Sequence, residues 1–396
     1  MADPRTLLPP AALRAAEAGQ MLLGPGFAGT GWVALGRPQD ILTSANLNEL
    51  RHYAADIPPG GTIAGYIGYE WAAGLEQRLS LPPSPDGLPI LWCARFGQVS
   101  PIAASSLPVP ADPAPTPTAT SPGASASAYE EQVRQVIALI RDGDIFQANI
   151  SRRLTARYDL PPSRLAPILF AHLVSRGEAP YAAYIPVTEG AVLSNSPELF
   201  FRVDDRRITT EPIKGTRPRG ATPEADEALA IALMRDPKDR AENVMIADLM
   251  RNDLSKVCAD HTITEDAICA LRTLPRVHHL YSRISGTLRS GLGVMDALGA
   301  AFPCGSITGA PKFRAMERIA EIEGEGRGPY CGTVFYIPDQ GPAVFSVAIR
   351  TAVISQQTGG SRLDLRAGGG VTILSDPAAE YAETEDKAYP FRSMMP

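Results

Sequence analysis

The sequence of 396 residues contains no apolar run near the length of about 18 residues that a membrane-spanning helix needs. Its N-terminus, MADPRTLLPPAALRAAEAG, has no basic stretch followed by an apolar one, so no signal peptide is expected. Basic residues form no block: Arg217 and Arg219 are too few for a nucleic-acid-binding face, and the formal net charge is −6. We therefore expect neither a membrane nor nucleic acid as a partner. An acidic chain with locally grouped Arg and Lys is typical of a protein that holds a small anionic substrate.

Cysteine is scarce, and no two cysteines form a CxxC pair. An odd, scattered set predicts reduced thiols in a cytoplasmic protein rather than a disulfide or zinc framework. The sequence also lacks HExxH, a phosphate loop ending in GKS or GKT, and a recognisable Ser-His-Asp pattern. These absences argue against zinc proteases, P-loop nucleotide enzymes and serine hydrolases. The five cysteines are Cys93, Cys258, Cys269, Cys304 and Cys331.

One segment divides the chain. Residues 100–128 are rich in Pro, Ala, Ser and Thr, nearly lack charge and show no apolar periodicity, which predicts a linker or long surface loop. We therefore expect an N-terminal region at residues 1–99 and a catalytic domain at residues 129–396. The length also allows one large unit.

Helices and strands occur in clusters rather than in strict alternation, which predicts an α+β fold with antiparallel sheets. GGTIAGYIGYEWAAG predicts a buried strand that meets a turn. Helices are expected after residue 128, where apolar residues recur at helical spacing, and at 225–235, 240–252, 312–323 and 377–388. Further strand-like runs are FQANISRRLTARY, YAAYIPV, AVLSNS, LFFRV, RRITTEPI, TVFYIP, FSVAIRTAVI and LDLRAGGGVTIL.

Two expected helices each carry a pair of carboxylates on one face. Glu380 and Glu383 are three residues apart in the helix that starts at Asp376-Pro377, and Asp239 and Glu242 have the same spacing. Two such helices can clamp a hard divalent cation such as Mg²⁺. A solvated charged face is the alternative for each pair.

Three further segments contain candidate functional groups. CGSITGAPK is a Gly-rich turn whose N–H groups, with the Thr308 hydroxyl, can bind an anion, although an ordinary helix entry is an equal alternative. TTEPIKGTRPRG places Lys214 between a strand and a Pro/Gly-rich turn, as a nucleophile or as a solvated lysine. His278 and His279 are adjacent, and one histidine of such a pair is usually structural.

The ordered motifs together resemble the chorismate-binding family, which includes anthranilate, aminodeoxychorismate, isochorismate and salicylate synthases. The resemblance covers about residues 125–390, whereas residues 1–99 resemble the family mainly through GYIGYE. It implies two antiparallel sheets sandwiched with helices, to which the N-terminal region contributes strands. The motifs, in order, are DIFQANISRRL, SNSPELFFRV, EPIKGTRPRG, ENVMIADLMRNDL, VHHLYSRISGTL, FPCGSITGAPKFRAMERIAEIE, RGPYCGTVFY, FSVAIRT and AGGGVTILSDPAAEYAETEDKA.

The resemblance also implies a magnesium cofactor and assigns site residues. Glu242 and Glu383 match the metal-ligand glutamates, with Asp239 and Glu380 as outer partners, and the Mg²⁺ holds the ring carboxylate of chorismate. His279 matches the active-site histidine. The other substrate contacts implied in this way are Thr308, Tyr330, Arg350, the N–H groups of Gly369 and Gly370, and Lys387.

Two sequence positions distinguish the reactions that members of this family catalyse. Isochorismate and salicylate synthases have a water-activating Lys at the position of Gln147, so water addition is disfavoured here. Anthranilate synthases have Ala at the position of Lys214, whereas aminodeoxychorismate synthases have Lys. The resemblance therefore implies that Glu198 protonates the C4 hydroxyl, Lys214 attacks C2, and ammonia adds at C4. The product expected is 4-amino-4-deoxychorismate, the precursor of 4-aminobenzoate for folate. The alternatives are an anthranilate synthase large subunit and a non-catalytic subunit of the family.

A source of ammonia is missing from the sequence. No GxCxG-type nucleophile elbow is present, so the resemblance implies a separate glutamine amidotransferase subunit. Cys304 stands where relatives usually have Gly, in a turn near the substrate. The tryptophan-binding LLES-like motif of feedback-inhibited relatives is not evident, so tryptophan regulation is not expected.

Overall fold

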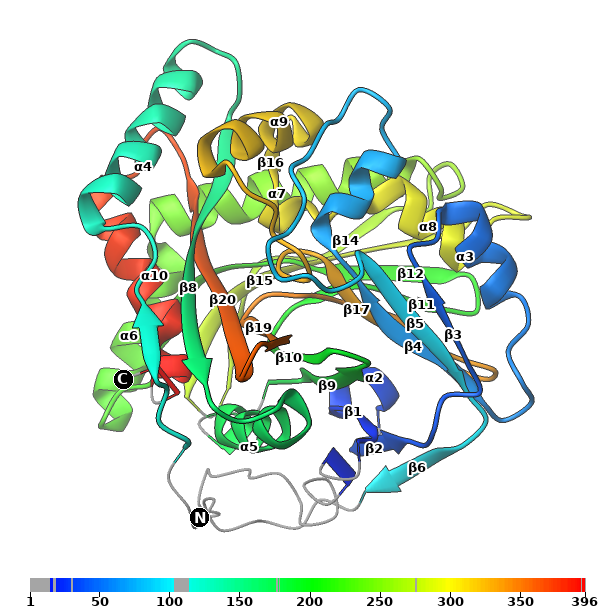
Figure 1. Cartoon of the computed structure of the whole chain (residues 1–396). Helices are drawn as coiled ribbons and strands as arrows, with labels where there is room; N and C mark the ends of the chain where they lie inside the picture. The colour runs from blue at the N-terminus through cyan, green and yellow to red at the C-terminus, as the bar shows by residue number, and fades with distance from the viewer. Residues whose placement is uncertain are drawn as a thin grey trace.

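The computed structural model describes residues 15–16, 19–29, 31–102, 114–175, 177, 179–274, 276–392 and 394–395. These residues form two large β-sheets with helices packed around them (Figure 1). Neighbouring strands run antiparallel throughout the described sheets. The predicted antiparallel α+β class is therefore confirmed. Among the described helices, none is long and apolar enough to cross a membrane.

The first sheet has the strand order β16-β8-β20-β19-β10-β9-β1-β2-β6, and β7 pairs with β8 beside this path. Its strands are β1 (Met21–Leu23), β2 (Trp32–Leu35), β6 (Val99–Ile102), β7 (Ala119–Ser121), β8 (Gln147–Tyr158), β9 (Tyr181–Val187), β10 (Gly190–Ser196), β16 (Gly309–Ala310), β19 (Thr351–Gln357) and β20 (Gly360–Val371).

The second sheet has the order β13-β15-β12-β11-β18-β17-β4-β5-β3, and β14 pairs with β15. Its strands are β3 (Asp40–Thr43), β4 (Thr62–Ile67), β5 (Leu91–Phe96), β11 (Leu199–Asp204), β12 (Arg207–Glu211), β13 (Ile213–Pro218), β14 (Thr264–Thr273), β15 (Val277–Thr287), β17 (Thr333–Pro338) and β18 (Ala343–Val347).

Helices cover the outer faces of both sheets and one end of the first. The α-helices are α2 (Pro25–Ala28), α3 (Leu47–Ala54), α4 (Ala126–Arg141), α5 (Pro162–Ser175), α6 (Pro223–Arg235), α7 (Pro237–Ser255), α8 (Val294–Ala301), α9 (Lys312–Glu323) and α10 (Pro377–Arg392). The described chain also contains the 3₁₀ turns η1 (Tyr69–Gly74) and η2 (Gly305–Ile307).

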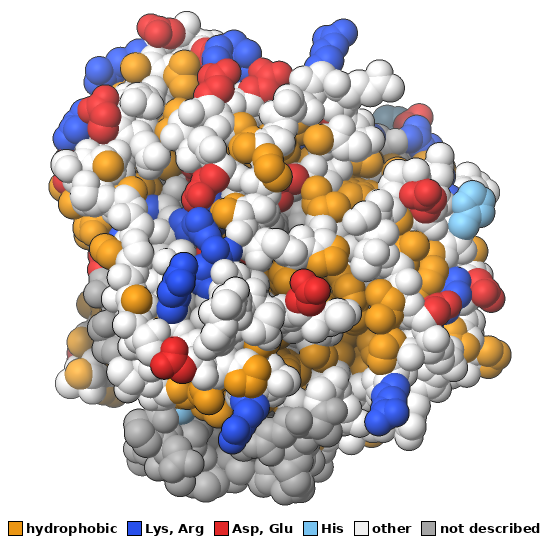
Figure 2. All heavy atoms as spheres, viewed as in Figure 1, with side chains coloured by type: hydrophobic (Ala, Val, Ile, Leu, Met, Phe, Trp, Pro, Cys, Tyr) orange, Lys and Arg blue, Asp and Glu red, His pale blue; other side chains and the backbone are white. Residues whose placement is uncertain are grey.

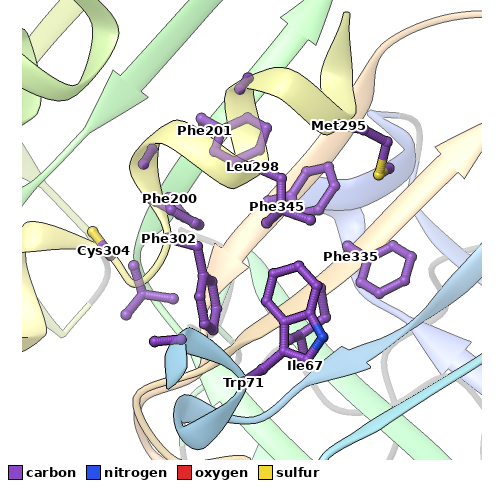
Figure 3. Packing of buried hydrophobic residues seen from close by; sticks show 14 of the residues in the cluster. Ile67, Trp71, Phe200, Phe201, Met295, Leu298, Phe302, Cys304, Phe335 and Phe345 are labelled. Atoms are coloured by element: carbon purple, nitrogen blue, oxygen red, sulfur yellow. The ribbon is translucent and has the colours of Figure 1, made fainter. Parts of the chain in front are cut away.

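Three hydrophobic layers hold these parts together. Between the sheets, Leu23, Tyr66 and Val344 belong to one buried cluster that draws on strands of both sheets. α5 covers the outer face of the first sheet, and α3, α7 and α8 cover the outer face of the second. In that last layer Trp71 meets Phe302 edge to face at 5.5 Å between ring centroids (Figure 3). Aromatic contacts of this kind add to the free energy gained from burial alone.

The N-terminal region lies within both sheets. β1, β2 and β6 belong to the first sheet, and β3, β4 and β5 belong to the second. The segment predicted as a linker is only partly described, because residues 103–113 lie outside the described residues. Its flanks are regular: β6 extends to Ile102, β7 pairs with β8, and α4 begins at Ala126 after its cap, Ser125. The irregular chain is therefore shorter than the composition indicates.

One predicted strand is wrong, and the difference bears on the site. FSVAIRTAVI is not one strand: β18 ends at Val347 in the second sheet, and β19 begins at Thr351 in the first. Arg350, with φ of +50°, lies at this crossing between sheets. Glu198 lies at a second crossing, between β10 and β11. The two crossings touch, since the Val347 N–H donates to the Glu198 carbonyl at 3.1 Å.

A buried ion pair fixes α9, which starts just after the Gly-rich turn, against α7. The Lys312 ammonium lies 2.5 Å from Asp253 Oδ2 and donates to the Ala301 carbonyl, also at 2.5 Å. Burial lowers the pKa of Lys312, and Asp253 opposes that shift. The ammonium therefore depends on this one carboxylate for its charge balance.

We predict that Asp253→Asn lowers the free energy of unfolding by about 3–5 kcal/mol, because it leaves a buried charge without its partner. Urea unfolding followed by circular dichroism measures this difference. Asp248→Asn is the matched control on the same helix, because Asp248 is 64% exposed and forms a surface ion pair with Arg251. Equal effects of the two substitutions would contradict the prediction.

Candidate active site

The glycines at the end of β20 form the floor of the candidate site. Gly370 pairs with Asn149 on β8. A Cβ atom at Gly370 would lie 2.6 Å from Gln147 Nε2 and 3.2 Å from Lys214 Nζ. A side chain here would therefore collide with both groups. The structure brings Gln147, Lys214 and Gly370 together.

Gln147 has no hydrogen-bond partner for either end of its side-chain amide, within the described residues. Gln147 is 1% exposed, so solvent does not supply the missing hydrogen bonds. Buried amides are normally paired, and an orphaned one at the floor of a site suits a polar ligand. Lys214 is placed differently: its ammonium donates to the Ser306 carbonyl at 3.1 Å.

Glu198 is a buried carboxyl group close to Lys214. Burial raises the pKa of Glu198 to about 6, although a hydrogen bond from Ser306 and the charge of Lys214 act in the opposite direction. Its Oε1 atom has no partner among the described residues. A carboxyl whose pKa is raised toward neutrality and that has one oxygen free can serve as a general acid.

The two adjacent histidines have different environments. His278 is bonded at both ring nitrogens, to Thr273 Oγ1 at 2.9 Å and to Asp226 Oδ1 at 2.8 Å. His279 is bonded at Nδ1 by Thr216 Oγ1 at 2.8 Å, and its Nε2 has no partner in the described structure. Burial, with help from Arg350, lowers the pKa of His279 to about 4. His278 is therefore the structural member of the pair, and His279 presents a neutral imidazole.

Three glutamates from α7 and α10 face one another beside Gly369. A Cβ atom at Gly369 would lie 2.9 Å from Glu380 Oε2 and 3.6 Å from Glu383 Oε2. Burial raises the pKa of Glu242, and the charges of Glu380 and Glu383 act in the same direction. Glu380 is 1% exposed and its Oε2 lacks a partner within the described residues. Glu242 and Glu380 are buried, whereas the Glu383 side chain is 45% exposed. Carboxylate oxygens are the ligands that a hard divalent cation prefers.

Lysines surround this carboxylate cluster. Lys238 Nζ lies 3.1 Å from Glu380 Oε1 and 3.9 Å from Glu242 Oε1. Lys387 Nζ lies 2.6 Å from Glu383 Oε1 and donates to the Gly368 carbonyl at 2.8 Å. With the side chains in these positions, no three His, Cys, Asp or Glu groups of the described chain converge as they would around a metal ion. Lysine ammonium groups balance the carboxylates instead.

Asp239 does not join this cluster. Its carboxylate lies 3.0 Å from the Arg217 guanidinium. Burial raises the pKa of Asp239, and Arg217 opposes that shift. The spacing from Glu242 predicted a shared face, but β13 brings Arg217 onto Asp239. The structure therefore gives no support to Asp239 as a partner of the carboxylate cluster.

The remaining predicted residues are Arg350, between β18 and β19, Tyr330, before β17, and Thr308, whose carbonyl accepts from the Asn149 N–H on β8. Burial lowers the pKa of Arg350, and in the described part of the chain no carboxylate offsets that shift. An unpaired guanidinium of this kind suits a carboxylate ligand. Burial also raises the pKa of Tyr330 well above its usual value, and the charge of Arg327 opposes the rise. The Thr308 hydroxyl is already engaged, since it donates to the Cys304 carbonyl at 3.2 Å.

Comparison with known proteins decides the family. A family model described as chorismate binding enzyme matches residues 13–393, which is nearly the whole chain. The chain belongs to the chorismate-binding enzyme family. Membership applies to the N-terminal strands as well as to the candidate site, because the match begins at residue 13.

Relatives within the family have different names. Aminodeoxychorismate synthase component 1 of Klebsiella aerogenes is 43% identical over 263 residues, covering 66% of this chain and 56% of the relative. Anthranilate synthase component 1 of Saccharolobus solfataricus is 36% identical over 348 residues, covering 84% and 80%. The crystal structure of anthranilate synthase component I from Streptococcus pneumoniae TIGR4 matches with a TM-score of 0.76, at 26% identity and 90% coverage of each chain. The match to the Klebsiella relative thus spans little more than half of that protein.

Two residues that contact the site of this chorismate-binding enzyme were missed in the sequence. Ser306 accepts a hydrogen bond from the Lys214 ammonium at its carbonyl, and Lys238 contacts Glu380. Ser306 lies inside the CGSITGAPK motif, which was interpreted through its Gly residues and Thr308 alone. Lys238 is four residues before Glu242 on α7, the helical spacing that joins opposite charges.

Proposed function

We propose that this chain is the synthase component that aminates chorismate at C4 to give 4-amino-4-deoxychorismate. The observation that carries the proposal is the position of Lys214. Its primary amine lies at the glycine floor, 3.2 Å from the Cβ position of Gly370, next to the buried acid Glu198. A lysine nucleophile with an acid beside it is what covalent amination at C4 requires.

The reaction has two balanced displacements. The Lys214 ammonium first loses a proton to solvent. Glu198 then gives its proton to the C4 hydroxyl while the Lys214 amine bonds to C2, the ring double bond shifts, and water leaves C4. Ammonia then bonds to C4, the double bond shifts back, and the C2–nitrogen bond breaks to release Lys214. A proton from the incoming ammonia returns to Glu198. The enolpyruvyl group is untouched, so the product retains it.

Two sets of groups bind the substrate. Arg350, without a carboxylate partner among the described residues, binds the enolpyruvyl carboxylate together with the N–H groups of the glycine floor. Glu242 and Glu383, with Glu380, would hold a Mg²⁺ ion. When bound, the ion supplies a positive charge that neutralises the ring carboxylate of chorismate. The orphaned Glu380 Oε2 supports this assignment.

The ammonia source belongs to the proposal as well. A separate glutamine amidotransferase subunit would deliver ammonia, and free ammonium would replace it less efficiently. The product would lead to 4-aminobenzoate for folate, in the cytoplasm. The five cysteines, all free and buried, are in keeping with such a compartment.

Anthranilate synthesis is the second candidate. The relative that covers more of both chains, from Saccharolobus solfataricus, has the name anthranilate synthase component 1. In that reaction ammonia adds at C2 and pyruvate is eliminated. Lys214 argues against it, because its amine would occupy the space at C2 that ammonia must enter.

The product distinguishes the two candidates. We predict that the purified chain, given chorismate, Mg²⁺ and ammonium at alkaline pH, forms a compound in which one amine replaces one hydroxyl and the enolpyruvyl group remains. Mass spectrometry measures this, and lactate dehydrogenase with NADH measures released pyruvate. Anthranilate with an equal amount of pyruvate would overturn the proposal and leave the fold and the family unaffected.

A further inference from the structure

Asn149 is a buried asparagine on β8 to which the proposed reaction assigns no role. It is 6% exposed and pairs directly with Gly370 of the glycine floor. Residues that lie directly opposite one another on paired antiparallel strands project their side chains to the same face of the sheet. The side chain of Asn149 is therefore on the face of the floor where Gln147 and Lys214 approach Gly370.

The neighbouring glycine confirms this assignment of faces. Gly369 pairs with Ile150, and a Cβ atom at Gly369 would lie closest to Glu380 and Glu383. Ile150 packs in the hydrophobic cluster formed with α4 and α9. Because successive residues of a strand face opposite sides, Asn149 faces away from these glutamates. The paired ends of β8 and β20 thus have a carboxylate side and an amide side.

The side-chain amide of Asn149 has a defined orientation. Its Nδ2 donates to the Ile307 carbonyl at 3.3 Å. A carbonyl oxygen only accepts hydrogen bonds, so the NH₂ end of the amide must face Ile307 and Oδ1 is the opposite end. The backbone N–H of Asn149 donates to the Thr308 carbonyl at 2.8 Å and fixes the strand beside the same turn. Oδ1 itself has no hydrogen-bond partner among the described residues.

A buried carbonyl oxygen without a partner needs a hydrogen-bond donor. The carboxylates of chorismate only accept hydrogen bonds, so neither of them suits Asn149 Oδ1. Two donors remain among the reactants: the C4 hydroxyl and ammonia. The hydroxyl takes a proton from Glu198 and leaves as water in the first displacement, whereas ammonia must be held for the second. Ammonia is therefore the donor whose position the reaction has to fix.

Neutral amide oxygens are suitable acceptors for a nucleophilic ammonia. They accept its N–H bonds, do not remove a proton, and leave its lone pair free to attack C4. A carboxylate in this place would favour ammonium, whose lone pair is already used. The charge of Lys214 on the same face also disfavours ammonium, because like charges repel. Gln147, whose amide has no partner at either end within the described structure, offers a second neutral acceptor.

We propose that Asn149 is an ammonia-binding residue, whose Oδ1 accepts a hydrogen bond from the ammonia that attacks C4 in the second displacement. This role rests on the C4 amination proposed above and adds to it a binding site for the second substrate. The Ile307 carbonyl, by holding Nδ2, keeps Oδ1 in place to receive ammonia.

Steady-state kinetics with ammonium chloride as the source of ammonia test this site. Asn149→Leu keeps a similar size and removes both polar atoms, so we expect the KM for ammonium to rise about 3- to 10-fold, with the KM for chorismate little changed. Asn149→Ala should act in the same direction, and it tests the site if leucine does not fit. Asn252→Ala is the control: this asparagine is exposed on α7, and the variant should behave as wild type.

The first displacement distinguishes ammonia binding from support of the turn. It needs no ammonia, so mass spectrometry of protein quenched after mixing with chorismate and Mg²⁺ alone measures adduct formation on Lys214. If Asn149 only holds the turn whose Ser306 carbonyl accepts from Lys214, both variants should slow adduct formation, which would overturn the proposal. An unchanged KM for ammonium, or a raised KM for chorismate instead, would overturn it as well. The ammonium KM tests Asn149 whatever the product, whereas release of pyruvate by wild-type protein would contradict C4 amination itself.

Discussion

Lys214→Ala is expected to lose C4 amination by a factor of about 10³ or more, because it removes the nucleophile of the first displacement. Chorismate should still bind, since Arg350 and the carboxylate cluster remain. Mass spectrometry of wild-type protein quenched during turnover should find the intact ligand skeleton, less one water, on Lys214. Formation of a C2-aminated product by Lys214→Ala would also support the role, because ammonia would then enter the space that the lysine amine left.

Two further variants distinguish a nucleophilic role of Lys214 from a purely electrostatic role. Lys214→Arg keeps a positive charge near Glu198 and Glu242 but has no free amine, so it should be as inactive as Lys214→Ala. Lys256→Ala is the matched control, because this lysine is 47% exposed at the end of α7. Full activity in Lys214→Ala with the same product would exclude covalent catalysis. Substantial activity in Lys214→Arg alone would reduce Lys214 to an electrostatic role.

Local patterns predicted several elements with accurate bounds. TVFYIP and YAAYIPV correspond to β17 and β9, and the helix predicted at 312–323 is α9. These segments have alternation or helical spacing bounded by Pro, Gly or turn residues, so their local signal is complete. FSVAIRTAVI failed because period-two alternation continues across the crossing at Arg350 and does not show a change of sheet.

The site residues were predicted mainly from sequence motifs shared with the family, and less from the spacing of residues along helices. Helical spacing placed Glu380 and Glu383 on one face, and the structure brings both to Gly369. The same rule placed Asp239 with Glu242, but spacing cannot show that Arg217, from strand β13, would pair with Asp239. Ser306 was missed because its backbone carbonyl contacts Lys214, a residue 92 positions away in sequence, where no local pattern reaches.

On the face in Figure 2, acidic and basic side chains are interspersed, and several basic side chains stand alone. No extended basic face is visible in this view. The formal net charge of −6 and this distribution favour a small anionic ligand over a polyanion.

Glu242→Gln should abolish the response of the protein to Mg²⁺. If the three glutamates hold the ion, wild-type protein gains about 2.7 kcal/mol of folding free energy at a Mg²⁺ concentration 100 times Kd. Thermal unfolding with Mg²⁺ or with EDTA measures this gain without any activity assay. In Glu242→Gln the melting temperature should be the same in both buffers, and C4 amination should fall at least about 10²-fold. Glu265→Gln, an exposed glutamate on β14, should behave as wild type.

Lys238 provides a second test of Mg²⁺ binding by the three glutamates. Its ammonium bridges Glu380 and Glu242, where the ion would bind. A bound Mg²⁺ ion and the Lys238 ammonium would repel each other. When Mg²⁺ binds, Lys238 must therefore move away from Glu380 and Glu242, or its attraction to these two carboxylates becomes weaker. Lys238→Met should therefore melt at a lower temperature than wild type in EDTA and gain more from Mg²⁺, since the carboxylates then depend on the ion alone. An identical Mg²⁺ shift in Lys238→Met, Glu242→Gln and wild type would show that the cation binds elsewhere, and the glutamates would then act through their lysines.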